Sequence, residues 1–133
     1  MASVRATLSL SSVGVLSSPL NISVNSLLVV DSGSLIRAKV KGTAADSNDL
    51  AIYIENQCRE RAYLYIKNME GELENYIFVH NDTDTGLVAK IGGGKFAFIP
   101  INPDKKLEVY ATKVDTMVEY GAFGLDSSAV TLS

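Results

Sequence analysis

The segment LVAKIGGGKFAFIPINP, residues Leu87–Pro103, contains two apolar runs joined by three consecutive glycines. Glycine reaches positive φ without a Cβ clash, so Gly92–Gly94 can form a tight reversal of the chain. We therefore predict a β-hairpin with strands at Leu87–Ile91 and Lys95–Ile99. This hairpin is the centre from which the rest of the fold is predicted.

Two prolines mark the end of this segment. Pro100 and Pro103 fix φ and donate no backbone N–H, so a strand that reaches them should stop. The second strand is predicted to end near Ile99. A turn is predicted at Asn102-Pro103-Asp104, because asparagine, proline and aspartate all favour turns.

Most of the remaining chain alternates between apolar and polar residues, which is the pattern of a half-buried β-strand. The strand candidates are Val4–Leu10, Leu20–Val30, Leu35–Lys41, Leu50–Ile54, Ala62–Asn68, Tyr76–Asn81, Leu107–Thr112 and Met117–Phe123. No long run has the 3.6-residue period of a helix. The sequence predicts an all-β protein, an antiparallel, jelly-roll-like β-sandwich of about nine short strands, because two sheets with one apolar face each bury those faces on each other. A β-barrel is the alternative.

Length and charge limit the possible classes of protein. The 133 residues carry a formal charge of −3 and a single cysteine, Cys58. This length suits one domain, residues 1–133, with its own core. One cysteine cannot form a disulfide within the chain, and we expect an inert, partly buried thiol. The mixed, slightly acidic charge does not favour nucleic acid, and no apolar run approaches the roughly 18 residues of a membrane helix.

The amino-terminal segment MASVRATLSLSSVGVLSS is rich in serine and free of acidic residues, as organelle transit peptides are. Its period-2 alternation at Val4, Ala6, Leu8 and Leu10 favours a strand instead. We predict an extended arm at Met1–Ser18. The weakly periodic segment 124–133 is predicted to be a tail.

Several chemical motifs were tested against the sequence and rejected. The GGGK motif has Ala89 and Phe96 where a phosphate-binding loop has its first glycine and its hydroxyl residue. In NDTDTG the aspartates fall between the ligand positions of a calcium loop. His80 is the single histidine, so it has no second histidine to form a metal or catalytic pair, and we expect a hydrogen-bonded surface group. The prediction is that the protein is not an enzyme and has no cofactor and no metal site.

The order of four strand motifs resembles a known family. YLYIKN at Tyr63–Asn68, IGGGKFAFIPINP at Ile91–Pro103, LEVYAT at Leu107–Thr112 and VEYGAF at Val118–Phe123 are similar to segments of small virion structural proteins of tailed bacteriophages, notably cyanophages. The amino-terminal Ser/Leu alternation is similar as well. The resemblance covers most of the chain and supplies no catalytic residues.

The resemblance implies a capsid decoration or cement protein on the exterior of the virion. Its partner would be the major capsid protein, and the chain would form a homo-oligomer, namely a trimer. It would bind neither nucleic acid nor a membrane. The interface residues expected on the arm, on the outward tyrosines and on the tail are Val4, Leu8, Leu10, Tyr63, Tyr65, Leu125 and Val130.

Two alternatives stay open at this stage. The chain could be a neck, tail or fibre protein of the virion. It could also be a glycan-binding β-sandwich that attaches to the host surface, in which outward tyrosines (Tyr63, Tyr65, Tyr110 and Tyr120) form an aromatic platform.

Overall fold

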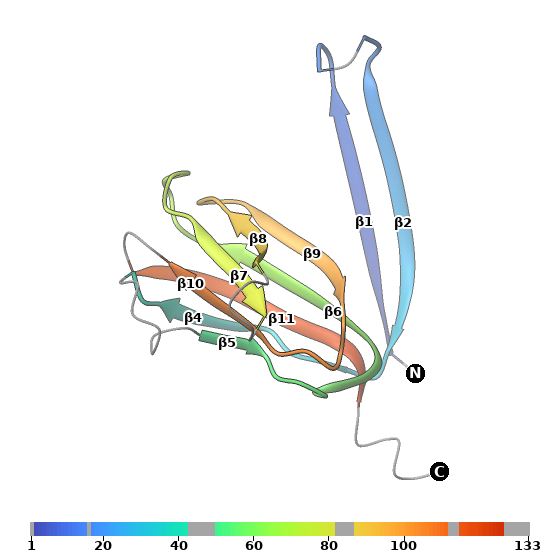
Figure 1. The fold of residues 1–133 in the computed structure, drawn as a ribbon. Helices are drawn as coiled ribbons and strands as arrows, with labels where there is room; N and C mark the ends of the chain where they lie inside the picture. Colours follow the sequence, from blue (N-terminus) through green and yellow to red (C-terminus); the bar gives the residue numbers. More distant parts are fainter. Residues whose placement is uncertain (1, 16, 43–49, 82–86, 112–114, 127–133) are drawn as a thin grey trace.

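The computed structural model describes residues 2–15, 17–42, 50–81, 87–111 and 115–126, and its described part contains eleven β-strands and no helix (Figure 1). The strands are β1 (Ala2–Ser12), β2 (Leu20–Val30), β3 (Ser32–Gly33), β4 (Ile36–Val40), β5 (Leu50–Tyr53), β6 (Cys58–Asn68), β7 (Ile77–Asn81), β8 (Leu87–Ile91), β9 (Phe96–Ile101), β10 (Leu107–Ala111) and β11 (Thr116–Asp126). All strand pairs are antiparallel. The predicted all-β antiparallel class is confirmed.

Two sheets form the body of the molecule in the arrangement of a β-sandwich. A four-stranded sheet has the order β5-β10-β7-β8, and a five-stranded sheet has the order β3-β11-β6-β9, with β4 also paired to β11. The core contains residues from both sheets, among them Val79 and Val109 from the first and Leu64 and Ile66 from the second. Each strand therefore contributes alternate side chains to one apolar interior.

The predicted glycine hairpin is wrong. β8 pairs with β7, and β9 pairs with β6, so the two strands beside the glycines belong to different sheets. The chain passes through Gly92–Gly94 from one sheet to the other and forms an arch rather than a hairpin (Figure 1).

The reason lies in what surrounds the glycines. A Cβ on Gly93 would lie 2.0 Å from the carbonyl oxygen of Glu72, and Gly94 has φ of +77°. Gly93 N–H donates to Leu73 O (3.2 Å) and Gly94 N–H to Asn68 O (2.9 Å). The glycines are needed for close packing of the arch against the turn before β7 as well as for backbone freedom.

The prolines behave largely as predicted. β9 extends two residues beyond the expected end and includes Pro100, which is tolerated because β9 is an edge strand that pairs with β6 alone. The turn at Asn102-Pro103-Asp104 is confirmed. Its Asn102 Oδ1 accepts a hydrogen bond from Asp104 N–H at 3.0 Å.

The alternation is confirmed most clearly in β10 and in β6 from Ala62 onward, where every second residue is buried. It fails at Ile36 and Ile54, which have the apolar phase of the predicted strands Leu35–Lys41 and Leu50–Ile54 but are exposed. β6 also begins earlier than predicted, at Cys58, because a register shift opposite Gly124 and Leu125 and a positive φ at Glu60 accommodate the polar residues there. β11 likewise continues to Asp126, into the predicted tail. Residues 82–86 of the NDTDTG motif lie outside the described residues.

Candidate interaction surface

A two-stranded hairpin, β1 with β2, projects from the sandwich, and we call it the arm (Figure 1). Eleven residues of β1 pair in register with eleven of β2, so the predicted arm strand has a partner that extends to Val30. At the base, Asp31 N–H donates to Gly124 O (2.9 Å) at the end of β11. The arm is thus a separate small sheet that is joined to the body at one end.

The register gives the arm an apolar face and an opposite face, called the polar face, which is polar from Thr7/Asn25 to Ser11/Asn21 and carries exposed Leu27 and Val29 nearer the base. Residues directly opposite each other share a face, and the pairs Val4/Leu28, Leu8/Val24 and Leu10/Ile22 alternate with Ser9/Ser23 and Ser11/Asn21. We call the first set, with Ala6, Leu20, Ser12 and Ser26, the apolar arm face. The single charged residue in 2–30, Arg5, lies on the opposite face and contacts Asn25 Oδ1 at 3.5 Å.

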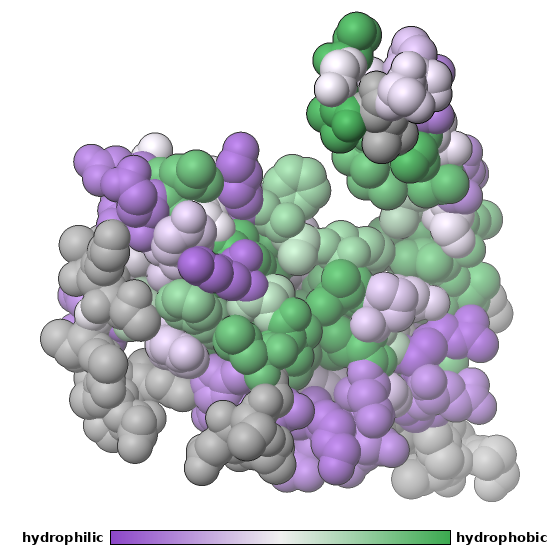
Figure 2. Space-filling model, turned by 45° about the horizontal axis from the view of Figure 1, so that its top comes forward, coloured by the Kyte–Doolittle hydropathy of each residue, from purple (hydrophilic) through white to green (hydrophobic). Residues whose placement is uncertain are grey.

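A cleft of about 450 Å³ lies between the arm and the edge strand β9. Hydrophobic surface lines the hollow between the arm and the sandwich (Figure 2). One wall comes from the arm and the other from β9, and the lining residues are Ala6, Thr7, Leu8, Val24, Asn25, Ser26, Phe96, Ala97, Phe98 and Ile99. None of them carries a charge. We call this space the arm cleft.

The body wall of the arm cleft is aromatic because of the phase of β9. Ala97 and Ile99 pack against the core, so the alternate residues Phe96 and Phe98 lie on the outer face of the five-stranded sheet. Phe98 stacks on Tyr63 of β6, with ring centroids 6.1 Å apart and planes at 8°. Phe96 has no such cover and is 66% exposed.

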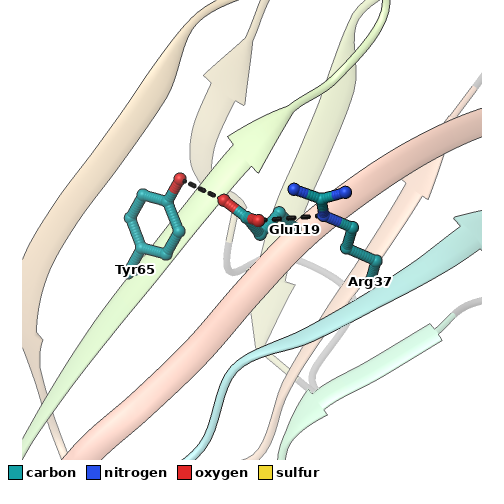
Figure 3. A network of polar contacts seen from close by, with 3 residues as sticks. All are labelled: Arg37, Tyr65 and Glu119. Atoms are coloured by element: carbon teal, nitrogen blue, oxygen red, sulfur yellow. Dashed lines mark hydrogen bonds and ion pairs between the residues drawn. The ribbon is translucent and has the colours of Figure 1, made fainter.

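A polar network crosses the same outer face (Figure 3). The Tyr65 hydroxyl of β6 donates to Glu119 Oε1 at 2.8 Å, and Glu119 Oε2 of β11 accepts from Arg37 Nε of β4 at 3.0 Å. The hydrogen bond from Tyr65 and that from Arg37 hold the pKa of Glu119 below its ordinary value of 4.5. Burial, with Glu119 as a smaller cause, raises the pKa of Tyr65 above 10.0.

This network predicts a pH dependence of stability. Because the pKa of Glu119 is lowered in the folded state, its contribution is present above about pH 4.5 and is lost as the pH falls through the folded-state pKa. In urea unfolding at a series of pH values, the wild type should lose stability more steeply below about pH 4.5 than Glu119→Gln, which cannot titrate. Tyr65→Phe, which keeps the carboxylate but removes one donor, should fall between them. Parallel curves for wild type and Glu119→Gln would contradict the assignment.

The expected interface residues lie at different places on the described part of the chain, and Leu8 is the one that lines the arm cleft. Leu8 lines the cleft, and Val4 and Leu10 lie on the same apolar arm face. Tyr63 and Tyr65 lie on the outer face of the five-stranded sheet, on β6 beside β9, where Tyr63 contacts Phe98 and Tyr65 is bonded to Glu119. Leu125, half-buried, follows the register shift of β11 next to the base of the arm. Val130 lies outside the described residues.

The four tyrosines of the glycan alternative do not form one platform. Tyr120 was predicted to point outward but packs against the core, because it has the phase of Val118 and Ala122 in β11. Tyr110 lies on the outer face of the other sheet, stacked on Phe78 with centroids 5.1 Å apart. Lys90 Nζ lies 4.3 Å from the centroid of the neighbouring Tyr76 ring. The ring faces in this group are therefore occupied by other side chains of the same sheet.

The residues considered for chemistry lie apart from the arm cleft. His80 Nδ1 donates to Asn81 O at 2.7 Å, as expected for a hydrogen-bonded group near a strand end. Cys58 is buried at the start of β6. The described residues contain no group of three or more histidine, cysteine, aspartate or glutamate side chains that could hold a metal ion. Nor does this part of the chain include a helix with the length and hydropathy needed to span a bilayer.

Sequence reasoning missed several residues of the arm cleft. The sequence pattern places Phe96 and Phe98 in a strand but does not indicate that they line a cleft. Nor does it indicate that Val24 lies opposite Leu8. One signal was available in the sequence, since two phenylalanines at the outward phase of a strand beside a proline leave large apolar rings without a core position. Leu8 and Val24 lie opposite each other because of the register of β1 and β2. The length of the turn between these strands does not predict that register.

Together the fold and the cleft define an all-β protein with an exposed apolar face on its arm. Comparisons of the chain with protein-family models, with curated proteins and with solved structures find no match.

Proposed function

We propose that this chain is a structural protein of a bacteriophage virion, and that it is a capsid decoration or cement protein on the outer surface of the shell. The observation that supports this most strongly is the arm, which exposes Leu8, Leu10, Ile22 and Val24 on one face instead of packing them in the core. The order of the strand motifs resembles that of small phage virion proteins, and this resemblance is why the proposed particle is a phage virion.

The division of the molecule suits a cement protein. The sandwich gives a rigid body, and the arm gives a long contact segment that can lie on a neighbouring subunit. Unpaired outer edges of β1 and β2 can also add to a sheet of the major capsid protein. Many copies on one shell multiply a modest affinity per site, which would hold adjacent capsomers together against the pressure of the packaged DNA.

Particles that lack the protein test this function. They should release DNA at a lower temperature or at low ionic strength, and purified wild-type protein should restore the resistance. Val24→Asp, on the apolar arm face, should restore it much less than Ser23→Asp, its neighbour on the polar face and outside the cleft lining. Particles whose stability is unchanged, or a map of the intact particle with this protein in the neck, tail or fibre, would contradict a cement role.

A further inference from the structure

The apolar arm face is exposed along its distal half. An isolated two-stranded hairpin is marginally stable in water, and it gains little unless its apolar side is buried. Here four large side chains at the distal end, Leu8, Leu10, Ile22 and Val24, are each more than 40% exposed. At the tip, Val13 and Val15 are 89% and 70% exposed. A flat apolar hairpin of this kind causes aggregation unless a specific partner covers it.

The walls of the arm cleft restrict what that partner can be. They contain no charged residue, so a charged occupant would lose its hydration without gaining an ion pair. Aromatic rings on β9 and aliphatic side chains on the arm favour an uncharged, apolar and extended segment.

The chain itself contains such a segment. In residues 2–30 the one charge, Arg5, lies on the polar side of the arm, so two apolar arm faces can meet without charge repulsion. The eleven paired positions give each arm a length of roughly 36 Å and a face roughly 10 Å wide. Two such faces in contact cover on the order of 700 Å² in projection, and contacts in the cleft add to this. The arm faces alone thus supply more than half of the roughly 1,200 Å² at which specific interfaces begin.

We propose that the arm cleft is filled by the arm of a second copy of this chain. The apolar faces of the arms pack against one another, and the tip with Val13 and Val15 enters the neighbour's cleft beside Phe96. In a dimer two faces meet directly, and in a trimer three faces enclose a common core; both use the same contact. This inference rests on the proposed function only in taking the arm as the contact segment.

Self-association of the purified full chain, without particles, is the test. Light scattering coupled to size-exclusion chromatography should give a mass of two or three times 14.3 kDa. Leu8→Asp or Val24→Asp should weaken association roughly 100-fold or more, as for a central interface residue. Ser9→Asp and Ser23→Asp, their neighbours on the polar face that do not line the arm cleft, should leave the mass unchanged. A monomer at about 100 µM, or equal effects of both pairs, would overturn the proposal.

Cross-linking keeps the test valid even if a charged variant disorders the arm. Leu10→Cys should form a disulfide between copies under mild oxidation, whereas Ser9→Cys, on the opposite face, and the wild type, with its buried Cys58, should not. Cross-linking at Ser9 alone, or none at Leu10, would overturn the proposal. If the purified chain passes these tests but does not protect particles, the cement function is refuted, whereas the association between the arms of different copies is not.

Discussion

Gly93→Val should destabilise the protein by at least about 3 kcal/mol in urea unfolding, a large share of the stability of a domain of this size. A Cβ at this position would lie 2.0 Å from Glu72 O, 2.7 Å from Glu72 C and 2.9 Å from Glu70 O. These are backbone atoms, so no rotation of a side chain relieves the collision. The arch and the 69–75 turn would have to separate, which would break the bond from Gly93 N–H to Leu73 O.

Two neighbouring glycines provide matched controls for this substitution. Gly94 has φ of +77°, and a Cβ there would lie 4.0 Å from Glu70 O, an ordinary contact, so Gly94→Asn should cost no more than about 1 kcal/mol, because asparagine tolerates the left-handed region. Gly71 has nothing within 4 Å, and Gly71→Ala should change stability by less than about 0.5 kcal/mol. Equal losses at Gly93 and Gly71 would show that the arch does not pack as described.

The alternation of apolar and polar residues was enough to predict most strands, because a residue such as Val109 or Leu64 can be buried in only one phase of a strand. Which strands pair is a different question. Gly92–Gly94 satisfies the rules for a tight turn equally well in a hairpin and in an arch. The arch is favoured by Asn68 and the 69–75 turn, which contact the glycines from 19 (Leu73 to Gly92) to 26 (Asn68 to Gly94) positions earlier in the chain. Local sequence does not contain that contact.

The candidate interaction surface could also be predicted only in part, because local sequence does not show what covers a strand face. The period-2 pattern at Val4, Leu8 and Leu10 predicted an arm strand with an apolar face. It did not distinguish a strand of the main sheets from a separate hairpin, because both have one apolar face. The difference lies in what covers that face, and for Leu8 and Val24 nothing in the described part of the chain does so fully. Phe96 and Phe98 became part of the site only because the arm projects beside β9.

Asn68→Ala should also cost at least about 3 kcal/mol, because it removes hydrogen bonds from three groups at once. Asn68 is fully buried at the end of β6, in the inward phase that Leu64 and Ile66 occupy. Its Nδ2 donates to Asn75 O (2.7 Å) and Ile91 O (3.0 Å), and its Oδ1 accepts from Glu70 N–H (3.0 Å). The side chain thus ties the 69–75 turn to the end of β8, across the two sheets. Asn75 makes its hydrogen bonds in the turn with backbone atoms. Asn75→Ala is therefore the matched control and should cost less than about 1 kcal/mol.

Asn68→Asp separates the hydrogen bonds from the volume of the side chain. A carboxylate of the same shape would face two carbonyl oxygens, Asn75 O and Ile91 O, and could donate to neither. Burial and these oxygens should raise the pKa of the new carboxyl in the folded state, so the variant should be most stable below the ordinary aspartate pKa of about 3.9 and lose stability as the pH rises through the raised value. The difference in unfolding free energy between wild type and variant should therefore grow from acidic to neutral pH, whereas for Asn68→Ala it should not. A difference for Asn68→Asp that is independent of pH would mean that Asn68 contributes its volume rather than its two donated hydrogen bonds.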